Sequence, residues 1–231
     1  MECIILAGGL GTRLRATIGD YPKCMAPVNG KPFLHYIFQY LQTQSCSRII
    51  LSLGYKHEII TEWLSKEDWN VSVDLVIENE PLGTGGGIQL AIQRAKEENV
   101  VVLNGDTFFD VDLKALFAFH ENKQAATTLA LRFMQQFVRY GSVNVDEEDR
   151  IVSFEEKKFK EDGLINGGVY VINKKHFLEK DLPEKFSFEK DYLEAFVHKG
   201  AFYGKRSEGY FIDIGIPEDF EKAQKDLNKI V

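Results

Sequence analysis

The sequence has few cysteines, and their spacing forms no metal-binding or redox motif. Only Cys3, Cys24 and Cys46 occur in 231 residues. An odd number of cysteines, without a CxxC pair or a Cys/His pattern, argues against a disulfide framework and against a structural zinc site. We therefore expect three free thiols.

The chain also lacks an excess of positive charge and a long apolar run. Lys and Arg total 28 against 35 Asp and Glu, which gives a formal net charge of −7. A sequence-independent nucleic-acid binder needs a basic surface, so no nucleic-acid partner is expected. The opening "MECIILAGGLG" has no basic segment before its short apolar run, so neither a signal peptide nor a membrane span is predicted. We expect a cytoplasmic protein without a membrane partner.

Linkers and internal repeats are missing from the sequence as well. No Pro/Ser-rich stretch marks a boundary, and 231 residues are enough for one sizeable hydrophobic core. The sequence thus predicts a single domain over residues 1–231.

The first half of the chain alternates apolar strands with amphipathic helices. Runs rich in β-branched residues predict strands at 3–7, 48–53, 71–77 and 100–104. Helical spacing of apolar residues predicts helices at 31–44, 57–66 and 87–98. Strands that are apolar on both faces, with helices between them, are typical of a parallel sheet covered on both sides.

The second half predicts further strands with hairpin-like links. They are expected at 125–133, 141–146, 151–156, 165–173, 201–206 and 209–215, with helices at 191–199 and 218–230. Asp112 is expected to cap a helix that starts with "LKALFAFH". Since these strands extend the first sheet, the predicted fold class is α/β, with a mixed, mostly parallel sheet and helices on both faces.

A glycine-rich loop follows the first predicted strand. Residues 7–15 are "AGGLGTRLR", and ligands of open α/β sheets bind at the carboxyl ends of strands. No Lys-Ser/Thr pair follows the last glycine, which excludes a Walker A motif, and Leu14 stands where the dinucleotide fingerprint needs its third glycine. Arg13 and Lys23, beside a run of backbone amides, instead suit a polyphosphate.

This loop resembles the signature of the sugar-1-phosphate nucleotidyltransferases, a family with a GT-A-like α/β fold. The family signature is G-G-x-G-T-R-L followed by P-K-x-[ML]-x-P-[VI], and "PKCMAPV" at 22–28 matches its second part. The resemblance continues in order through "EPLGTGGG" (80–87), "NGDTFFD" (104–110), "RYGSVNVD" (139–146), "FEEK" (154–157), "NGGVYV" (166–171) and "FIDIGIPEDF" (211–220). It implies transfer of a nucleotidyl group from a nucleoside triphosphate to a sugar 1-phosphate, with release of pyrophosphate.

The resemblance also implies which residues bind the triphosphate and the metal. Lys23 would neutralise charge near the α-phosphate, and Asp106 and Asp213 would hold Mg²⁺, the expected cofactor. Arg13, Lys23 and Asp106 would be the catalytic residues. The nucleotide is expected against the loop residues Leu6, Ala7, Gly8, Gly9, Gly11, Thr12 and Arg13.

The sugar phosphate is expected to bind mostly to the C-terminal half, and the nucleotide to the N-terminal half. Lys157 is similar in position to the family lysine that binds the sugar phosphate, and Glu156 would accept hydrogen bonds from hydroxyls. Asn166 offers both a donor and an acceptor to a polyol. Gly141 and Gly167 would let the sugar approach the backbone.

An acidic segment bears on the choice of nucleobase. The family places a base-binding residue before the Gly-Thr turn, and here Glu78 and Glu80 are the candidates, with Gly83 and Thr84 beside them. A carboxylate can accept from both N1–H and N2–H₂ of guanine, whereas uracil and thymine would turn carbonyl oxygens toward it. GTP is therefore the expected nucleotide. The alternative is that Glu78 and Glu80 are two exposed charges before a turn and do not read the base.

The resemblance favours D-glycero-α-D-manno-heptose 1-phosphate as the sugar substrate, because larger mannose-1-phosphate guanylyltransferases carry additional C-terminal sequence. Mannose 1-phosphate is the near alternative, since a pocket distinguishes one extra carbon by only ~1–3 kcal/mol. A uridylyl- or cytidylyltransferase for another phosphorylated sugar also stays open, as does a non-catalytic nucleotide-sugar-binding regulatory protein. The family often forms dimers or tetramers, so a homodimer is possible.

Overall fold

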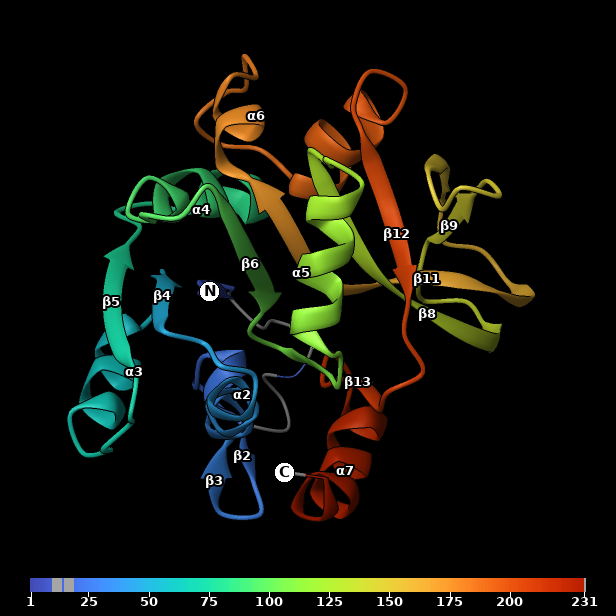
Figure 1. The fold of residues 1–231 in the computed structure, drawn as a ribbon. Helices are drawn as coiled ribbons and strands as arrows, with labels where there is room; N and C mark the ends of the chain where they lie inside the picture. The colour runs from blue at the N-terminus through green and yellow to red at the C-terminus, as the bar shows by residue number, and fades with distance from the viewer. Residues whose placement is uncertain (10–13, 15–18, 231) are drawn as a thin grey trace.

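The computed structural model describes residues 1–9, 14 and 19–230, and in this part of the chain the main sheet contains nine strands (Figure 1). Its path is β10-β9-β11-β6-β1-β4-β5, with β8 on β11 and β12 on β8. The parallel section consists of β6 (Asn99–Asn104), β1 (Glu2–Ala7), β4 (Arg48–Leu53) and β5 (Ser72–Ile77). The four strands predicted in the first half are confirmed, each to within one residue.

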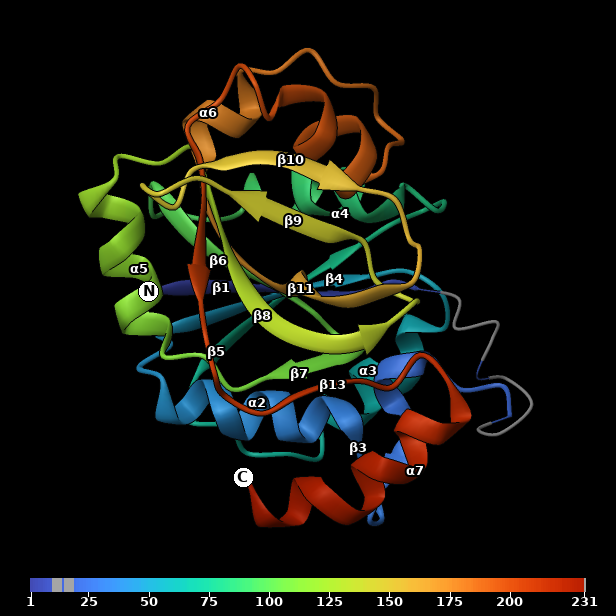
Figure 2. The same ribbon diagram turned by 90° about the vertical axis from the view of Figure 1, so that its right-hand side faces the viewer.

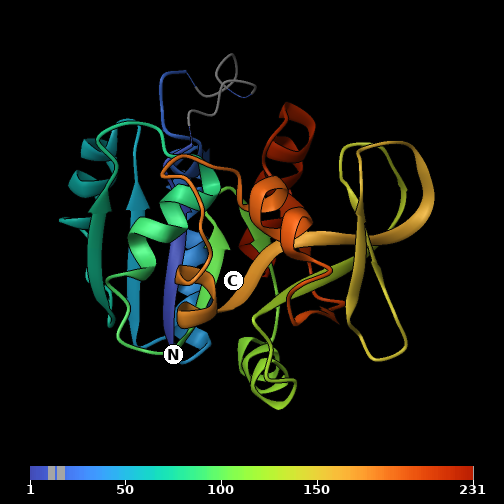
Figure 3. The same cartoon turned by 90° about the horizontal axis from the view of Figure 1, so that it is seen from above.

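The antiparallel section is built around one long strand, β11 (Lys160–Asn173), which pairs with β6 and with β8 (Thr127–Phe137). Strands β9 (Ser142–Val145) and β10 (Ile151–Glu155) form a hairpin, and β9 pairs with β11. Strand β12 (Phe202–Arg206) lies parallel to β8, and β13 (Phe211–Asp213) pairs with β7 (Thr107–Phe109), so the hairpin-like link predicted between 201–206 and 209–215 is wrong. Because β11 pairs with β6, one sheet runs through both halves of the chain, and Figure 3 shows its two sections on opposite sides of the molecule.

Helices cover both faces of the parallel section, and the predicted fold class is confirmed. Successive side chains of a strand point to opposite faces, so Ile5 packs into one core cluster and Ile4 into the other. The first cluster lies under α2 (Phe33–Thr43), α3 (His57–Leu64), α5 (Leu113–Asn122) and α7 (Pro217–Asp226). The second lies under α4 (Gly83–Ile92) and α6 (Lys174–Leu178).

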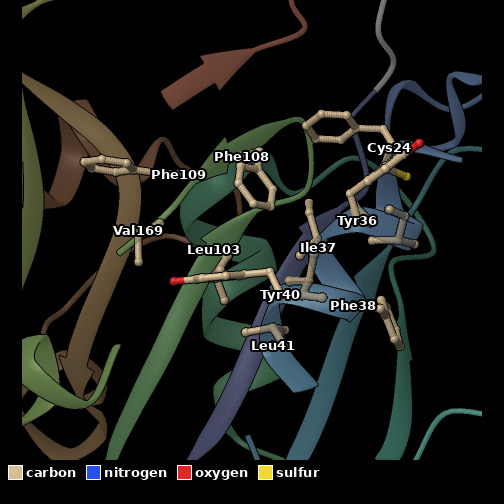
Figure 4. Packing of buried hydrophobic residues seen from close by; sticks show 14 of the residues in the cluster. Cys24, Tyr36, Ile37, Phe38, Tyr40, Leu41, Leu103, Phe108, Phe109 and Val169 are labelled. Atoms are coloured by element: carbon tan, nitrogen blue, oxygen red, sulfur yellow. The ribbon is translucent and has the colours of Figure 1, made fainter. Parts of the chain in front are cut away.

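Aromatic side chains fill the first core cluster beside the strand ends (Figure 4). The rings of Tyr40, on α2, and Phe108 meet edge to face with centroids 5.5 Å apart. The Tyr40 hydroxyl donates to the carbonyl of Val111 at 2.6 Å, so this buried polar group is satisfied. The contacts fix α2 against the segment that follows β6.

Two predicted helices differ most from the observed ones, whereas α2, α3 and α7 differ from their predictions only at their ends. The helix predicted at 87–98 begins at Gly83 and ends at Ile92, because the amides of Arg94 and Ala95 bond to carbonyls three residues back and tighten the chain into turns. The helix predicted at 191–199 is a π-helix, η2 (Phe188–Glu194). The predicted cap of α5 is confirmed, since Asp112 Oδ1 accepts from the amide of Ala115 at 2.9 Å.

The three cysteines are free, as expected. Short elements complete the described part of the chain. These elements are η1 (Lys23–Met25), β2 (Pro27–Val28), β3 (Lys31–Pro32), β7 (Thr107–Phe109), β13 (Phe211–Asp213) and η3 (Leu227–Lys229). Figure 2 shows β7 and β13 side by side, which brings the segment after β6 next to the C-terminal part of the chain. Over the described ranges, no helix has both the length and the apolar character that a membrane crossing requires.

Candidate active site

Two neighbouring cavities open where the parallel strands end. The first has a volume of about 410 Å³ and the second of about 380 Å³. Asn104, the last residue of β6, lines both. Strand β6 has a parallel neighbour, β1, and an antiparallel neighbour, β11. Ligands of open α/β sheets bind at the carboxyl ends of strands, so this edge of the sheet is where a ligand is expected.

The first cavity brings together most of the described residues that were predicted to bind the nucleotide. Glu80 is exposed and does not line the cavity, and Gly11, Thr12 and Arg13 lie outside the described residues. Ser52 also lines it, and no motif in the sequence pointed to this residue. The predicted residues in its wall are Leu6, Ala7, Gly8, Gly9, Lys23, Glu78, Gly83, Thr84 and Asp106.

Glu78 holds a fixed carboxylate in the wall of this first cavity. The Ser52 hydroxyl donates to its Oε1 at 3.3 Å, and the amide of Leu82 donates to its Oε2 at 3.1 Å. A Cβ atom at position 87 would lie 2.8 Å from Oε1, so Gly87 leaves room for the carboxylate. Each oxygen has two lone pairs, and among the described residues only one donor bonds to each oxygen, which leaves one lone pair on each to accept.

Packing explains the glycines at the start of α4. Gly83 has a φ of +76°, and a Cβ atom there would lie 2.5 Å from the carbonyl oxygen of Phe186. The amide of Gly85 donates to the same oxygen at 3.0 Å, and the amide of Phe186 donates to the carbonyl of Leu82 at 3.0 Å. The segment before η2 is therefore fastened to the first turn of α4, and these glycines are needed whether or not a ligand is bound.

Lys23 connects the two carboxylates that the resemblance assigns to the metal. Its Nζ lies 2.6 Å from Asp106 Oδ2 and 3.2 Å from Asp213 Oδ1. The β7–β13 pairing sets Thr107 opposite Asp213 and so brings the two aspartates together. The amide of Gly215 donates to Asp213 Oδ1 at 2.8 Å and orients that carboxylate further. The Lys23 side chain is 11% exposed, so these carboxylates take the place of most of its water.

The two aspartates have the chemistry that a divalent cation requires. Their carboxylates converge on one point, which Lys23 Nζ marks, and Mg²⁺ prefers hard oxygen ligands. Within residues 1–9, 14 and 19–230, no group of three or more His, Cys, Asp or Glu side chains forms a complete metal site. A Mg²⁺ ion held here would therefore need phosphate oxygens or water to complete its coordination.

The second cavity brings together all five residues predicted for the sugar phosphate. The pair Glu156 and Lys157 is exposed at this cavity. Asp213 belongs to its lining and links it to Lys23. The predicted residues in its wall are Gly141, Glu156, Lys157, Asn166 and Gly167. Further lining residues on β7, β9 and η2 were not predicted from the sequence, namely Thr107, Ser142, Val143, Glu189, Lys190, Leu193 and Glu194.

A β-bulge shapes the wall around Asn166. The register between β11 and β8 shifts between Asn166 and Tyr170. The side-chain oxygen of Asn166 accepts from the amide of Gly168 at 3.0 Å, and its side-chain nitrogen donates to the Tyr170 hydroxyl at 2.8 Å. Bulges next to binding sites redirect side chains. At Gly167 a Cβ atom would lie 2.3 Å from the ring of Phe109, so packing by itself requires that glycine.

Glu155 is the carboxylate of the "FEEK" block that supports the strands. It accepts from the side chains of Asn144 at 2.9 Å and Lys160 at 2.8 Å, and it pairs with Lys158. These hydrogen bonds, that of Asn144 foremost, lower the pKa of Glu155 to about 2. Glu155 thus ties β9 and β10 to β11, and Glu156 is the neighbouring carboxylate that is not part of this network.

Residues 2–230 match the nucleotidyl transferase family, and the chain belongs to that family. It is 51% identical, over 231 residues and 100% of both chains, to the D-glycero-α-D-manno-heptose 1-phosphate guanylyltransferase of Aneurinibacillus thermoaerophilus. It is 50% identical over 220 residues to the protein of the same description from Campylobacter jejuni, with 95% of this chain and 97% of the relative covered. The crystal structure of HddC from Yersinia pseudotuberculosis complexed with GMP-PN matches with a TM-score of 0.88 and 41% identity, over 97% of this chain and 98% of that one.

Proposed function

We propose that this protein is a sugar-1-phosphate guanylyltransferase that joins D-glycero-α-D-manno-heptose 1-phosphate and GTP to give a GDP-sugar and pyrophosphate. The observation that carries this proposal is that the two cavities share Asn104 and are linked by the ion pair of Lys23 with Asp213. Gly8 and Gly9 line the first cavity, and polar side chains such as Glu156 and Asn166 line the second. The two relatives of 51% and 50% identity, matched over nearly their full length, support both the sugar and the nucleotide.

The reaction asks the protein for positioning and charge neutralisation. A phosphate oxygen of the sugar 1-phosphate attacks the α-phosphorus of GTP, a new P–O bond forms, and the bond to pyrophosphate breaks. The attacking group is already an anion near pH 7, so no side chain has to remove a proton. Lys23 places a fixed positive charge where the two substrates would meet, and charge placed in advance stabilises the transition state without reorganisation.

Asp106 and Asp213 would hold Mg²⁺ beside Lys23. When bound, this ion would neutralise charge on the transferring phosphoryl group. Gly8 and Gly9 line the same cavity, and their backbone amides are proposed to bind the phosphates. The resemblance adds Gly11, Thr12 and Arg13 to this triphosphate site.

Glu78 is the residue that we propose to recognise guanine. Its two remaining lone pairs, one on each oxygen, match the adjacent N1–H and N2–H₂ donors of the base. Uracil would instead bring a carbonyl oxygen against a carboxylate. Glu80 is the alternative base-binding residue, and its exposure makes it the weaker candidate.

Lys157 is proposed to bind the phosphate of the sugar substrate, because a charge-assisted hydrogen bond to phosphate suits an ammonium at this cavity. Glu156 and Asn166 would bind ring hydroxyls, with Gly141 and Gly167 in the same wall. Mannose 1-phosphate is the alternative substrate, since the ring and the phosphate would meet the same groups.

Pyrophosphate release tests the proposal directly. The purified protein is supplied with Mg²⁺ and each of GTP, UTP, CTP, ATP and dTTP, against the heptose 1-phosphate and mannose 1-phosphate. Release with GTP and the heptose, far above every other pair, is the expected result. Faster release with mannose would replace the sugar and keep the mechanism. No release with any pair would contradict the enzymatic proposal.

The localisation, assembly and partners of the enzyme are part of the same proposal. We expect a cytoplasmic protein, with a homodimer as the assembly to be tested, and small-molecule substrates in place of nucleic-acid or membrane partners. The net charge of −7 supports the part that concerns nucleic acid. Light scattering on the purified chain measures the assembly.

A further inference from the structure

One wall of the second cavity comes from the π-helix η2. Glu189, Lys190, Leu193 and Glu194 of this element line the cavity. None of the sequence blocks that resemble the family includes these residues. π-helical turns are rare and often occur at functional sites. This wall therefore holds charged side chains whose role is separate from the residues discussed above.

The Glu189 carboxylate is oriented through one of its two oxygens. Its Oε2 accepts from the Thr84 hydroxyl at 3.0 Å and from the Ser187 hydroxyl at 3.2 Å. Thr84 in turn accepts from the amide of Phe188 at 2.9 Å, which directs the threonine proton toward the carboxylate. No hydrogen bond to Glu189 Oε1 is present among the described residues. An oriented carboxylate oxygen with free lone pairs thus remains for a ligand.

The negative charge of Glu189 determines which part of the substrate it can bind. A carboxylate repels a phosphate and accepts hydrogen bonds from hydroxyls. Among the described lysines, Lys23 and Lys157 line the two cavities away from η2, and Lys190 lines the second cavity beside Glu189, so these cations are the groups that attract the phosphate. Glu189 belongs to η2, which packs on the start of α4, whereas Glu156 follows β10 and Asn166 lies on β11. Its partner is therefore a hydroxyl that those two residues do not bind.

We propose that Glu189 is a specificity-determining residue for the sugar, which accepts a hydrogen bond from a hydroxyl of the side chain that the sugar carries outside its ring. A heptose has a diol there and a hexose only one hydroxyl, so this contact favours the heptose. The inference rests on the function proposed above. Thr84, which lines the first cavity, holds Glu189 in place and so connects the nucleotide side with the choice of sugar.

The test compares two sugars in matched variants. The wild-type protein, Glu189→Gln and Glu189→Ala are assayed with saturating GTP and Mg²⁺ on the heptose 1-phosphate and on mannose 1-phosphate. Glu179→Gln is the control, because Glu179 is exposed at the end of α6 and lines neither cavity. The ratio of kcat/KM for heptose over mannose is expected to fall ~10-fold or more in both Glu189 variants, mainly through KM for the heptose. The KM for GTP and the ratio in Glu179→Gln should stay as in the wild type.

Two outcomes would overturn the inference. An equal loss with both sugars in the Glu189 variants would mean that this carboxylate supports the ring or the fold. A wild-type protein that uses both sugars equally well would leave no preference for Glu189 to explain. Failure of the proposed function is a different observation, namely no pyrophosphate release by the wild type with GTP and either sugar. In that case calorimetry would measure the dissociation constants of the two sugar phosphates with the wild type and with Glu189→Gln. A preference for the heptose that is lost in the variant would support the role of Glu189, and an unchanged preference would overturn it.

Discussion

Replacing Glu78 by glutamine should weaken the selection of guanine. In the wild-type site Ser52 and Leu82 use one lone pair on each carboxylate oxygen, which leaves two acceptors for the two donors of the base. A glutamine amide has one oxygen, and its NH₂ group would face either the Leu82 amide or a guanine donor. At least one charge-assisted hydrogen bond of ~1.5–3 kcal/mol is then lost, so kcat/KM for GTP should fall ~10- to 150-fold.

The assay for this prediction is the ratio of kcat/KM for GTP over UTP, measured by pyrophosphate release. Removal of the negative charge takes away the repulsion of a uracil carbonyl, so the value for UTP should not fall in parallel. Glu80→Gln is the matched control, because Glu80 is exposed and outside the cavity. The reasoning is refuted if the ratio stays within ~3-fold of the wild type in Glu78→Gln and drops in Glu80→Gln.

Three further substitutions test other parts of the molecule. Asp106→Asn should lower Mg²⁺-dependent kcat ~100-fold or more with only a small change in unfolding temperature, because Asn has the same shape and Asp213 still pairs with Lys23; near-normal turnover would rule out the metal role. Lys157→Met should raise KM for the sugar phosphate ~10-fold or more while KM for GTP is unchanged; equal effects on both substrates would contradict its role. Burial lowers the pKa of His120 to about 4, so its neutral form stabilises the fold above pH 6.5, and this contribution, ~3 kcal/mol at most, is lost as the pH falls to 4. His120→Gln should flatten the unfolding free energy measured over this range, and an unchanged slope would refute the assignment.

The parallel section could be predicted from the sequence because its local pattern and its environment agree. Strands buried on both faces are rich in apolar residues on both sides, and "RIILSL", with four apolar residues of six, gives the bounds of β4 directly. The start of α4 could not be found this way. Its four glycines argue against a helix, and only their contacts with the segment at Phe186 explain why a helix forms there.

Some residues of the candidate site could likewise be predicted from the sequence, and others could not. Lys23, Asp106 and Asp213 stand in blocks with a known family pattern, and the structure brings them together. Glu189 stands in no such block, and it reaches the second cavity only because η2 packs on α4. Residues that a remote element brings into a site leave no local signal, whereas residues of a loop that follows a strand do.

Strand β6 also sets how such a protein can change over evolutionary time. Its parallel neighbour β1 leads into the first cavity, which we propose to bind the nucleotide, while its antiparallel neighbour β11 lines the second. If the proposed roles of the two cavities hold, substitutions in the antiparallel section and in η2 would exchange the accepted sugar and leave the triphosphate site unchanged. Among the described residues, Asn104 alone lines both cavities. We therefore expect it to be substituted later than its neighbours when the accepted sugar changes.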